Sequence, residues 1–134
     1  MTNKKNTLGI TSKSFDNNSI IPKKYTGFGE DVSPPFTISG LSKDAVSIAI
    51  VMDDLDIPFI KAFNHWLIWN IPAVNEIPEN IPQGKIVTAL GNAKQGIGYG
   101  HNRYRGPKQP FFIRNRHRSV SYTHLRAHET RRHL

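Results

Sequence analysis

Proline and glycine recur throughout this 134-residue chain, with nine Pro and ten Gly dividing it into short apolar runs. Both residue types interrupt helices, so this punctuation favours an all-β or loop-rich fold over a helical bundle. The two strongest runs are VSIAIVM, residues 46–52, and FNHWLIWNIP, residues 63–72. The first is nearly all apolar, as in a buried central strand, and the second carries apolar residues on both faces. We therefore predict a one-domain β-sandwich with long loops.

The composition excludes several classes of protein. The chain has no cysteine, which rules out disulfides, a thiolate nucleophile and a Cys-type zinc site. The basic N-terminal segment lacks the apolar run of a secretory signal, and no run is long enough to cross a bilayer. We therefore expect a cytoplasmic protein without a membrane span. The formal net charge of +8 suggests a polyanionic partner, although residues 119–134 contribute +2 of it, from three Arg and one Glu.

Two aspartates and a histidine flank the turn between the two strong runs. Asp54 and Asp56 follow the first run, and strict alternation along the second would place His65 on one face with Leu67 and Trp69. If the two strands pair, the carboxylates and the imidazole converge at one end of the sheet. There they can orient a histidine N–H towards an anion or act as an acid/base pair. The alternative is that the aspartates form a turn and that His65 is a buried core histidine.

The segment GYGHNRYRGPKQPFFIRNRHR, residues 98–118, contains a second group of candidate binding residues. Gly106 and Pro107 can stiffen a loop whose backbone N–H groups then suit an anion. His117 lies between Arg116 and Arg118, which add a field attractive to phosphate. The alternative is a solvated basic strand edge, because arginine is common on edges that must avoid aggregation.

Seven short motifs follow one another along the chain: SPPF at 33–36, DDLDIP at 53–58, HW at 65–66, NIP at 70–72, GYG at 98–100, GP at 106–107 and RHR at 116–118. This ordered series resembles the phosphatidylethanolamine-binding protein family, in its bacterial Raf-kinase-inhibitor-like branch. The resemblance covers about residues 8–118, most of the chain. It implies an antiparallel β-sandwich whose small surface pocket binds phosphate-type anions without a cofactor, in a protein that inhibits or regulates other proteins.

The family's pocket residues have counterparts here by motif. These are the two acids and closing proline of an Asp-Pro-Asp-x-Pro motif, the histidine before Trp, the Gly-Pro of the pocket rim and the histidine of a His-Arg motif. Leu55 replaces the first proline of the acid motif, and Ser119 stands where the family usually has an aromatic residue. The ligand-binding residues that the resemblance implies are, in the same order, Asp54, Asp56, Pro58, His65, Gly106, Pro107 and His117.

The last sixteen residues differ in character from the rest. The apolar alternation of a further strand stops at Arg118, and SVSYTHLRAHETRRHL resembles translated sequencing-adapter sequence. We therefore interpret residues 1–118 as an incomplete domain of this family and residues 119–134 as a non-native tail. Closing strands and a C-terminal helix would then be missing, leaving a sheet edge unpaired. Two weaker alternatives are a helical metal site at His124 and His128 and a basic arm for nucleic acid.

These observations favour a small-anion binding module. A phosphate-bearing ligand would lie between His65, His117 and the backbone of Gly106 and Pro107, and Asp54 would accept a hydrogen bond from an imidazole. A protein partner is a further candidate, and no metal is expected. An enzyme is not expected, although a hydrolase-like alternative would use Asp54, His65 and His117. Nucleic-acid binding ranks last, and it would use Arg103, Arg105, Lys108, Arg114, Arg116 and Arg118 with Tyr104, Phe111 and Phe112.

Overall fold

The computed structural model describes residues 8–16, 19–54, 63–98, 100–108 and 123–131. Over these residues the chain is mainly β, and its only helices are the 3-10 turns η1 (Lys23–Tyr25) and η2 (Thr88–Leu90). The strands are β1 (Gly9–Thr11), β2 (Phe36–Ser39), β3 (Ala45–Asp54), β4 (Phe63–Pro72), β5 (Glu76–Ile77), β6 (Ile86–Val87), β7 (Ala93–Gln95), β8 (Ile97–Gly98), β9 (His101–Asn102) and β10 (Thr123–Arg131).

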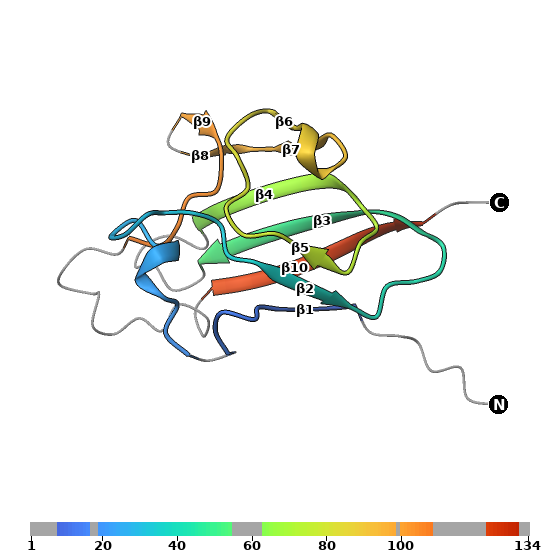
Figure 1. The fold of residues 1–134 in the computed structure, drawn as a ribbon, viewed down its shortest axis with the longest axis horizontal. Helices are drawn as coiled ribbons and strands as arrows, with labels where there is room; N and C mark the ends of the chain where they lie inside the picture. Colours follow the sequence, from blue (N-terminus) through green and yellow to red (C-terminus); the bar gives the residue numbers. More distant parts are fainter. Residues whose placement is uncertain (1–7, 17–18, 55–62, 99, 109–122, 132–134) are drawn as a thin grey trace.

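The strands form two antiparallel sheets and a separate two-stranded ribbon. The small sheet has the order β1-β2-β5, the large sheet has the order β10-β3-β4-β7-β6, and β8 pairs with β9. The small sheet lies across one face of the large sheet (Figure 1). Phe36 of β2 stacks on Trp66 of β4 with ring centroids 6.3 Å apart, and Ile38, Ile50 and Ile68 are buried in the same core. The predicted all-β sandwich is therefore confirmed.

The two strongest apolar runs form the centre of the large sheet, as predicted. Residues 46–52 lie inside β3, and β4 coincides with the run at 63–72. The two strands pair antiparallel along most of their length. β-Branched and aromatic side chains suit this position, because each strand has neighbours on both sides and the core on one face.

The predicted alternation along β4 is wrong, because the register between β3 and β4 shifts twice. Met52 pairs with Trp66 but Asp53 pairs with Asn64, so β4 has one extra residue at this point. A β-bulge of this kind re-aims the side chains that follow it. His65 and Trp66 are therefore both buried, whereas Leu67 and Trp69 are each 37% exposed.

A second bulge lies further along β4. Ile50 pairs with Ile68 and Ile48 pairs with Ile71, so β4 again has one residue more than β3. Asn70 lies in this stretch with a φ of 59°, a left-handed conformation that asparagine tolerates better than most residues. The bulge restores Ile71 to the core face of the sheet, where it is fully buried.

The structure contains a strand that the sequence does not predict. Residues Thr123–Arg131 form β10, which pairs antiparallel with β3 at one edge of the large sheet. The sequence analysis predicted that a sheet edge would lack a partner without saying which one, and the edge at β3 has a partner. Backbone pairing explains the difference, because a long buried strand has a row of N–H and C=O groups that need partners. The assignment of residues 119–134 as a tail foreign to the domain stays a prediction.

A buried amide links the core to the loop that follows β5. Trp66 Nε1 donates a hydrogen bond to Gln95 Oε1 at 2.9 Å, and Gln95 Nε2 donates to the carbonyl oxygens of Pro82 at 2.8 Å and Gly84 at 3.2 Å. Gln95 is almost fully buried. Its polar groups are thus satisfied inside the core, and they fix the loop at residues 82–84 against β7.

Candidate ligand-binding site

His65 lies near the start of β4, at the end of the large sheet where β3 ends. It is 4% exposed, and its carbonyl oxygen accepts a hydrogen bond from the backbone N–H of Arg105 at 2.8 Å. Asp54 is the last residue of β3 and pairs with Phe63, two positions before His65. One end of the large sheet therefore gathers the end of β3, His65 and the segment that leads into Gly106.

The predicted rim residues Gly106 and Pro107 are buried against the loop that follows η1. The Gly106 N–H donates to Asp31 Oδ1 at 2.7 Å, and the Pro107 carbonyl accepts the Gly27 N–H at 2.9 Å. Gly106 lacks room for any side chain, because an added Cβ would lie 2.9 Å from Thr26 Cα and closer still to Asp31 Oδ1 and the Tyr25 carbonyl oxygen. Gly106 therefore forms a compact wall whose own N–H is engaged with Asp31.

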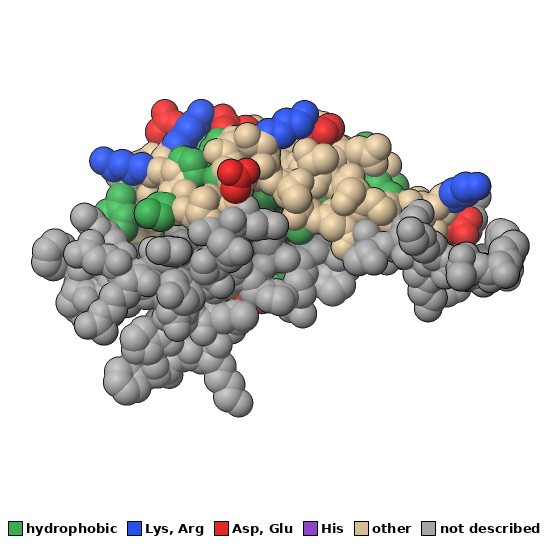
Figure 2. Space-filling model, turned by 90° about the horizontal axis from the view of Figure 1, so that it is seen from below, with side chains coloured by type: hydrophobic (Ala, Val, Ile, Leu, Met, Phe, Trp, Pro, Cys, Tyr) green, Lys and Arg blue, Asp and Glu red, His purple; other side chains and the backbone are tan. Residues whose placement is uncertain are grey.

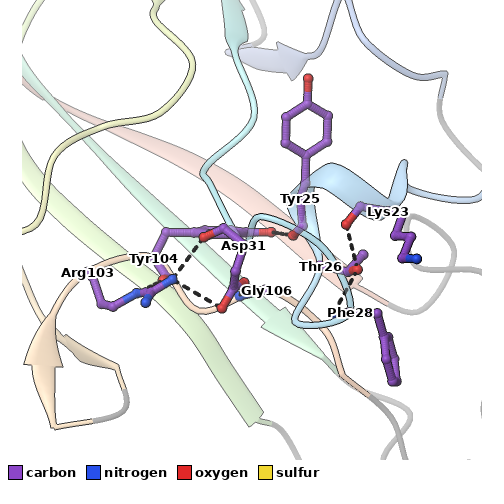
Figure 3. Close-up of polar contacts among 8 residues, drawn as sticks. All are labelled: Lys23, Tyr25, Thr26, Phe28, Asp31, Arg103, Tyr104 and Gly106. Carbon is purple, nitrogen blue, oxygen red and sulfur yellow. Dashed lines mark hydrogen bonds and ion pairs between the residues drawn. The ribbon is translucent and has the colours of Figure 1, made fainter.

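Asp31 contacts Gly106 of the rim, and Arg103 contacts Asp31 (Figure 3). Arg103 Nη2 lies 3.1 Å from Asp31 Oδ2 and donates to the Asp31 carbonyl oxygen at 2.9 Å. Asp31 adopts a φ of 58°, which aspartate accepts more readily than most residues. Asp31 is not among the predicted site residues. The sequence signal is weak, because GEDVSPPF shows only two adjacent acidic residues between a Gly and a proline pair.

Tyr104 is buried between the rim and the core. Its hydroxyl donates to the Tyr25 carbonyl oxygen at 2.7 Å, and its ring packs edge-on against Trp66 with centroids 5.6 Å apart. Tyr104 is 2% exposed. Tyr104 is therefore not available to stack on a nucleic-acid base, the role that the nucleic-acid alternative gave it together with Phe111 and Phe112.

A polar pocket of about 220 Å³ opens on the side of the rim where Asp31 and Arg103 lie. The SPPF motif helps to shape it, because Ser33 Oγ accepts the Ile81 N–H and the Ser33 carbonyl oxygen accepts the Asn80 N–H, each at 2.9 Å. The pocket is lined by Glu30, Asp31, Val32, Ser33, Asn80, Ile81, Pro82, Gln83, Arg103 and Tyr104. The carboxylates and amides in this lining make it polar.

Three ionisable groups near η1 perturb one another. Lys24 Nζ lies 2.7 Å from Glu79 Oε2, and the Tyr25 hydroxyl donates to Glu79 Oε1. The hydrogen bond from Lys24, followed by that from Tyr25, lowers the pKa of Glu79, and the same Lys24 bond raises the pKa of Lys24. Burial, then the bond to Glu79, raises the pKa of Tyr25. This cluster fixes the loop at residue 79 to η1.

The structure unites only part of the predicted site. It brings the end of β3 at Asp54, His65, Gly106 and Pro107 to one end of the large sheet. Asp56, Pro58 and His117 lie outside the described residues. So does the part of the basic segment that follows Lys108, residues 109–118. On the described part of the face in Figure 2, basic and acidic side chains alternate instead of forming a basic stripe.

Among the described residues, no three or more histidine, cysteine, aspartate or glutamate side chains are grouped so that they could hold a metal ion. The same residues contain no helix that combines the length and apolar character needed to span a membrane.

Comparisons with known proteins agree with this architecture. The chain is 44% identical over 100 residues to a UPF0098 protein of Pyrococcus abyssi, covering 74% of this chain and 56% of that protein. A UPF0098 protein of Pyrococcus horikoshii is also 44% identical over 100 residues, covering 74% of this chain and 50% of the relative. The chain therefore spans about half the length of these curated relatives. A UPF0098 protein of Methanothermobacter thermautotrophicus is 34% identical, and 68% of it is covered together with 77% of this chain.

Two solved structures share the fold. A phosphatidylethanolamine-binding protein homologue from Chlamydia trachomatis matches with a TM-score of 0.66 at 28% identity, over 79% of this chain and 68% of that one. E. coli YbcL, described as a member of the mammalian family, matches with a TM-score of 0.62 at 24% identity, over 77% of this chain and 67% of that one. The sequence profile of the phosphatidylethanolamine-binding protein family matches residues 11–123. The chain therefore belongs to the phosphatidylethanolamine-binding protein family.

Proposed function

We propose that this protein is a binding module for a small phosphate-type anion, and that it regulates or inhibits other proteins through that site. The ligand would lie at the end of the large sheet, with His65 and His117 supplying N–H donors and positive charge. Gly106 and Pro107 would form one wall. The observation that carries the proposal is the 2.8 Å hydrogen bond from Arg105 to His65, because it joins two parts of the site that lie far apart in the sequence.

The remaining site residues have supporting roles in this proposal. Asp54 follows Asp53 at the end of β3 and would accept a hydrogen bond from an imidazole, which favours the protonated ring. Asp56 and Pro58 would shape the loop that follows β3. Because Gly106 donates its N–H to Asp31, we assign the Gly-Pro pair a steric role, with the two histidines as the anion's donors.

Membership of the family supports a binding role. We propose no catalytic step. A cytoplasmic location and a place in the Raf-kinase-inhibitor-like branch stay predictions.

The test is calorimetric titration of the full chain with inorganic phosphate and with phenyl phosphate. The double variant His65→Ala/His117→Ala is expected to lose binding, whereas His101→Ala, an exposed histidine on β9, should keep it. Unchanged phosphate affinity in the double variant would refute the proposal.

A further inference from the structure

We propose that Asp31 and Arg103 form a charge-compensated pair that positions the Gly106 wall and sets the electrostatic potential at the anion site. The inference rests on the proposed function, and it assigns a role to two residues outside the predicted site. Asp31 acts through Gly106, and Arg103 acts through Asp31. Both are therefore positioning residues, and neither is proposed to touch the anion.

The geometry of the pair supports this role. One Asp31 carboxylate oxygen, Oδ1, accepts the Gly106 N–H at 2.7 Å, and the other, Oδ2, lies 3.1 Å from Arg103 Nη2. The same Arg103 nitrogen also binds the Asp31 carbonyl oxygen at 2.9 Å. The Asp31 side chain is 15% exposed and the Arg103 side chain is 24% exposed. Water therefore screens this pair less than a surface ion pair.

Hydrogen bonds join the segment that carries Gly106 to the region of η1 on one side and to β4 on the other. The Tyr104 hydroxyl donates to the carbonyl oxygen of Tyr25, the last residue of η1, and the Gly106 N–H donates to Asp31 in the loop that follows (Figure 3). Arg105, between them, donates its N–H to the His65 carbonyl oxygen. A shift of Gly106 away from Asp31 would therefore be transmitted through one residue to the backbone of the predicted ligand histidine.

The charges of the pair act on an anion in opposite directions. A carboxylate whose oxygen touches the rim N–H would repel an incoming phosphate, and the arginine beside it cancels this repulsion. Removal of Arg103 alone leaves the acid uncompensated. Removal of the acid's charge alone takes away the repulsion and makes the local potential more positive, which attracts the anion. The two single changes should thus alter the affinity with opposite signs.

The experiment measures phosphate affinity for three variants of the full chain. Arg103→Gln is expected to weaken binding by about tenfold, because a nearby carboxylate loses its counter-charge. Asp31→Asn keeps an oxygen acceptor for the Gly106 N–H, tolerates the left-handed backbone, and should tighten binding by about threefold. The double variant should return close to the wild-type affinity, since both charges are gone.

The control is Lys94→Gln, which removes one exposed positive charge from β7 and should change the affinity less than twofold. Circular dichroism confirms that each variant is folded, and the Gly106 amide proton shift in nuclear magnetic resonance reports whether its bond to residue 31 persists. The changes in phosphate affinity caused by each substitution should be smaller in about 0.5 M salt, because salt shortens the Debye length and screens the charges.

The outcomes separate this inference from the proposed function. If the wild type binds phosphate and Asp31→Asn weakens binding as much as Arg103→Gln does, the pair is merely structural and the inference is overturned while the function stands. Equal affinity in all three variants would overturn it as well. If the wild type itself binds no phosphate, both proposals are wrong. Opposite signs with recovery in the double variant support the inference.

Discussion

Replacement of Gly106 with alanine is expected to destabilise the protein by about 1–3 kcal/mol. The new Cβ would lie 2.9 Å from Thr26 Cα and closer to the Tyr25 carbonyl oxygen and Asp31 Oδ1. Two of these three neighbours belong to the backbone and cannot rotate away. Overpacking of this kind costs about 1–3 kcal/mol. If the segment moves out instead, it loses a hydrogen bond to a carboxylate, which costs about 1.5–3 kcal/mol.

Urea unfolding followed by tryptophan fluorescence measures this free energy, with Gly96→Ala as the matched control. An added Cβ at Gly96 would meet Leu67 atoms at 3.5–3.8 Å, an ordinary contact distance. The control should therefore stay within about 1 kcal/mol of the wild type, with the small gain that alanine gives by restricting the unfolded chain. Equal stabilities of the Gly106→Ala and Gly96→Ala variants would refute the steric argument.

Three further perturbations follow from the fold. Gln95→Met strips a buried indole N–H and two loop carbonyl oxygens of their partner, so it should cost about 2–4 kcal/mol in urea unfolding; a loss no larger than that of the exposed control Gln83→Met would contradict this. Because the bond to Lys24 lowers the pKa of Glu79, its stabilisation is present above the ordinary glutamate pKa of about 4.3 and is lost as the pH falls through the lowered value. Glu79→Gln should therefore lower the Tm at pH 7, and a Tm difference that persists unchanged at the lowest pH would show this reasoning to be wrong. Deletion of residues 119–134 removes β10 from the edge of β3 and should cause aggregation detectable by light scattering, whereas a monomeric product with an unchanged Tm would show that the edge needs no cover.

Hydrophobic pattern alone identified the centre of the large sheet. The run at 63–72 became β4 and the run at 46–52 became most of β3, because apolar β-branched and aromatic residues with no helical period can bury themselves only as paired strands. The two β-bulges in β4 could not be predicted from the hydrophobic pattern. They depend on how β3 and β4 align, and a single strand's sequence holds little information about its partner's register.

The candidate site was predictable where its residues occur in recognisable motifs. His65 before Trp66, and Gly106 before Pro107, were identified in this way, and the structure brings the two segments together through Arg105. Asp31 was missed because its role arises from a contact between residues 75 positions apart. β10 was missed for a different reason: its polar composition does not indicate a strand, and only the available edge of β3 makes pairing favourable.

The bulge at the start of β4 means that the direction of His65 depends on how many residues precede Trp66, as well as on which residues they are. Deletion of Asn64 would leave every other side chain in the sequence intact, yet it would remove the extra residue opposite β3 and turn His65 relative to the core. Alanine scanning would not reveal this dependence, because substitutions preserve the residue count. A scan of single-residue deletions across the strand would reveal it directly, as loss of the proposed phosphate binding in a chain that still contains His65 and His117.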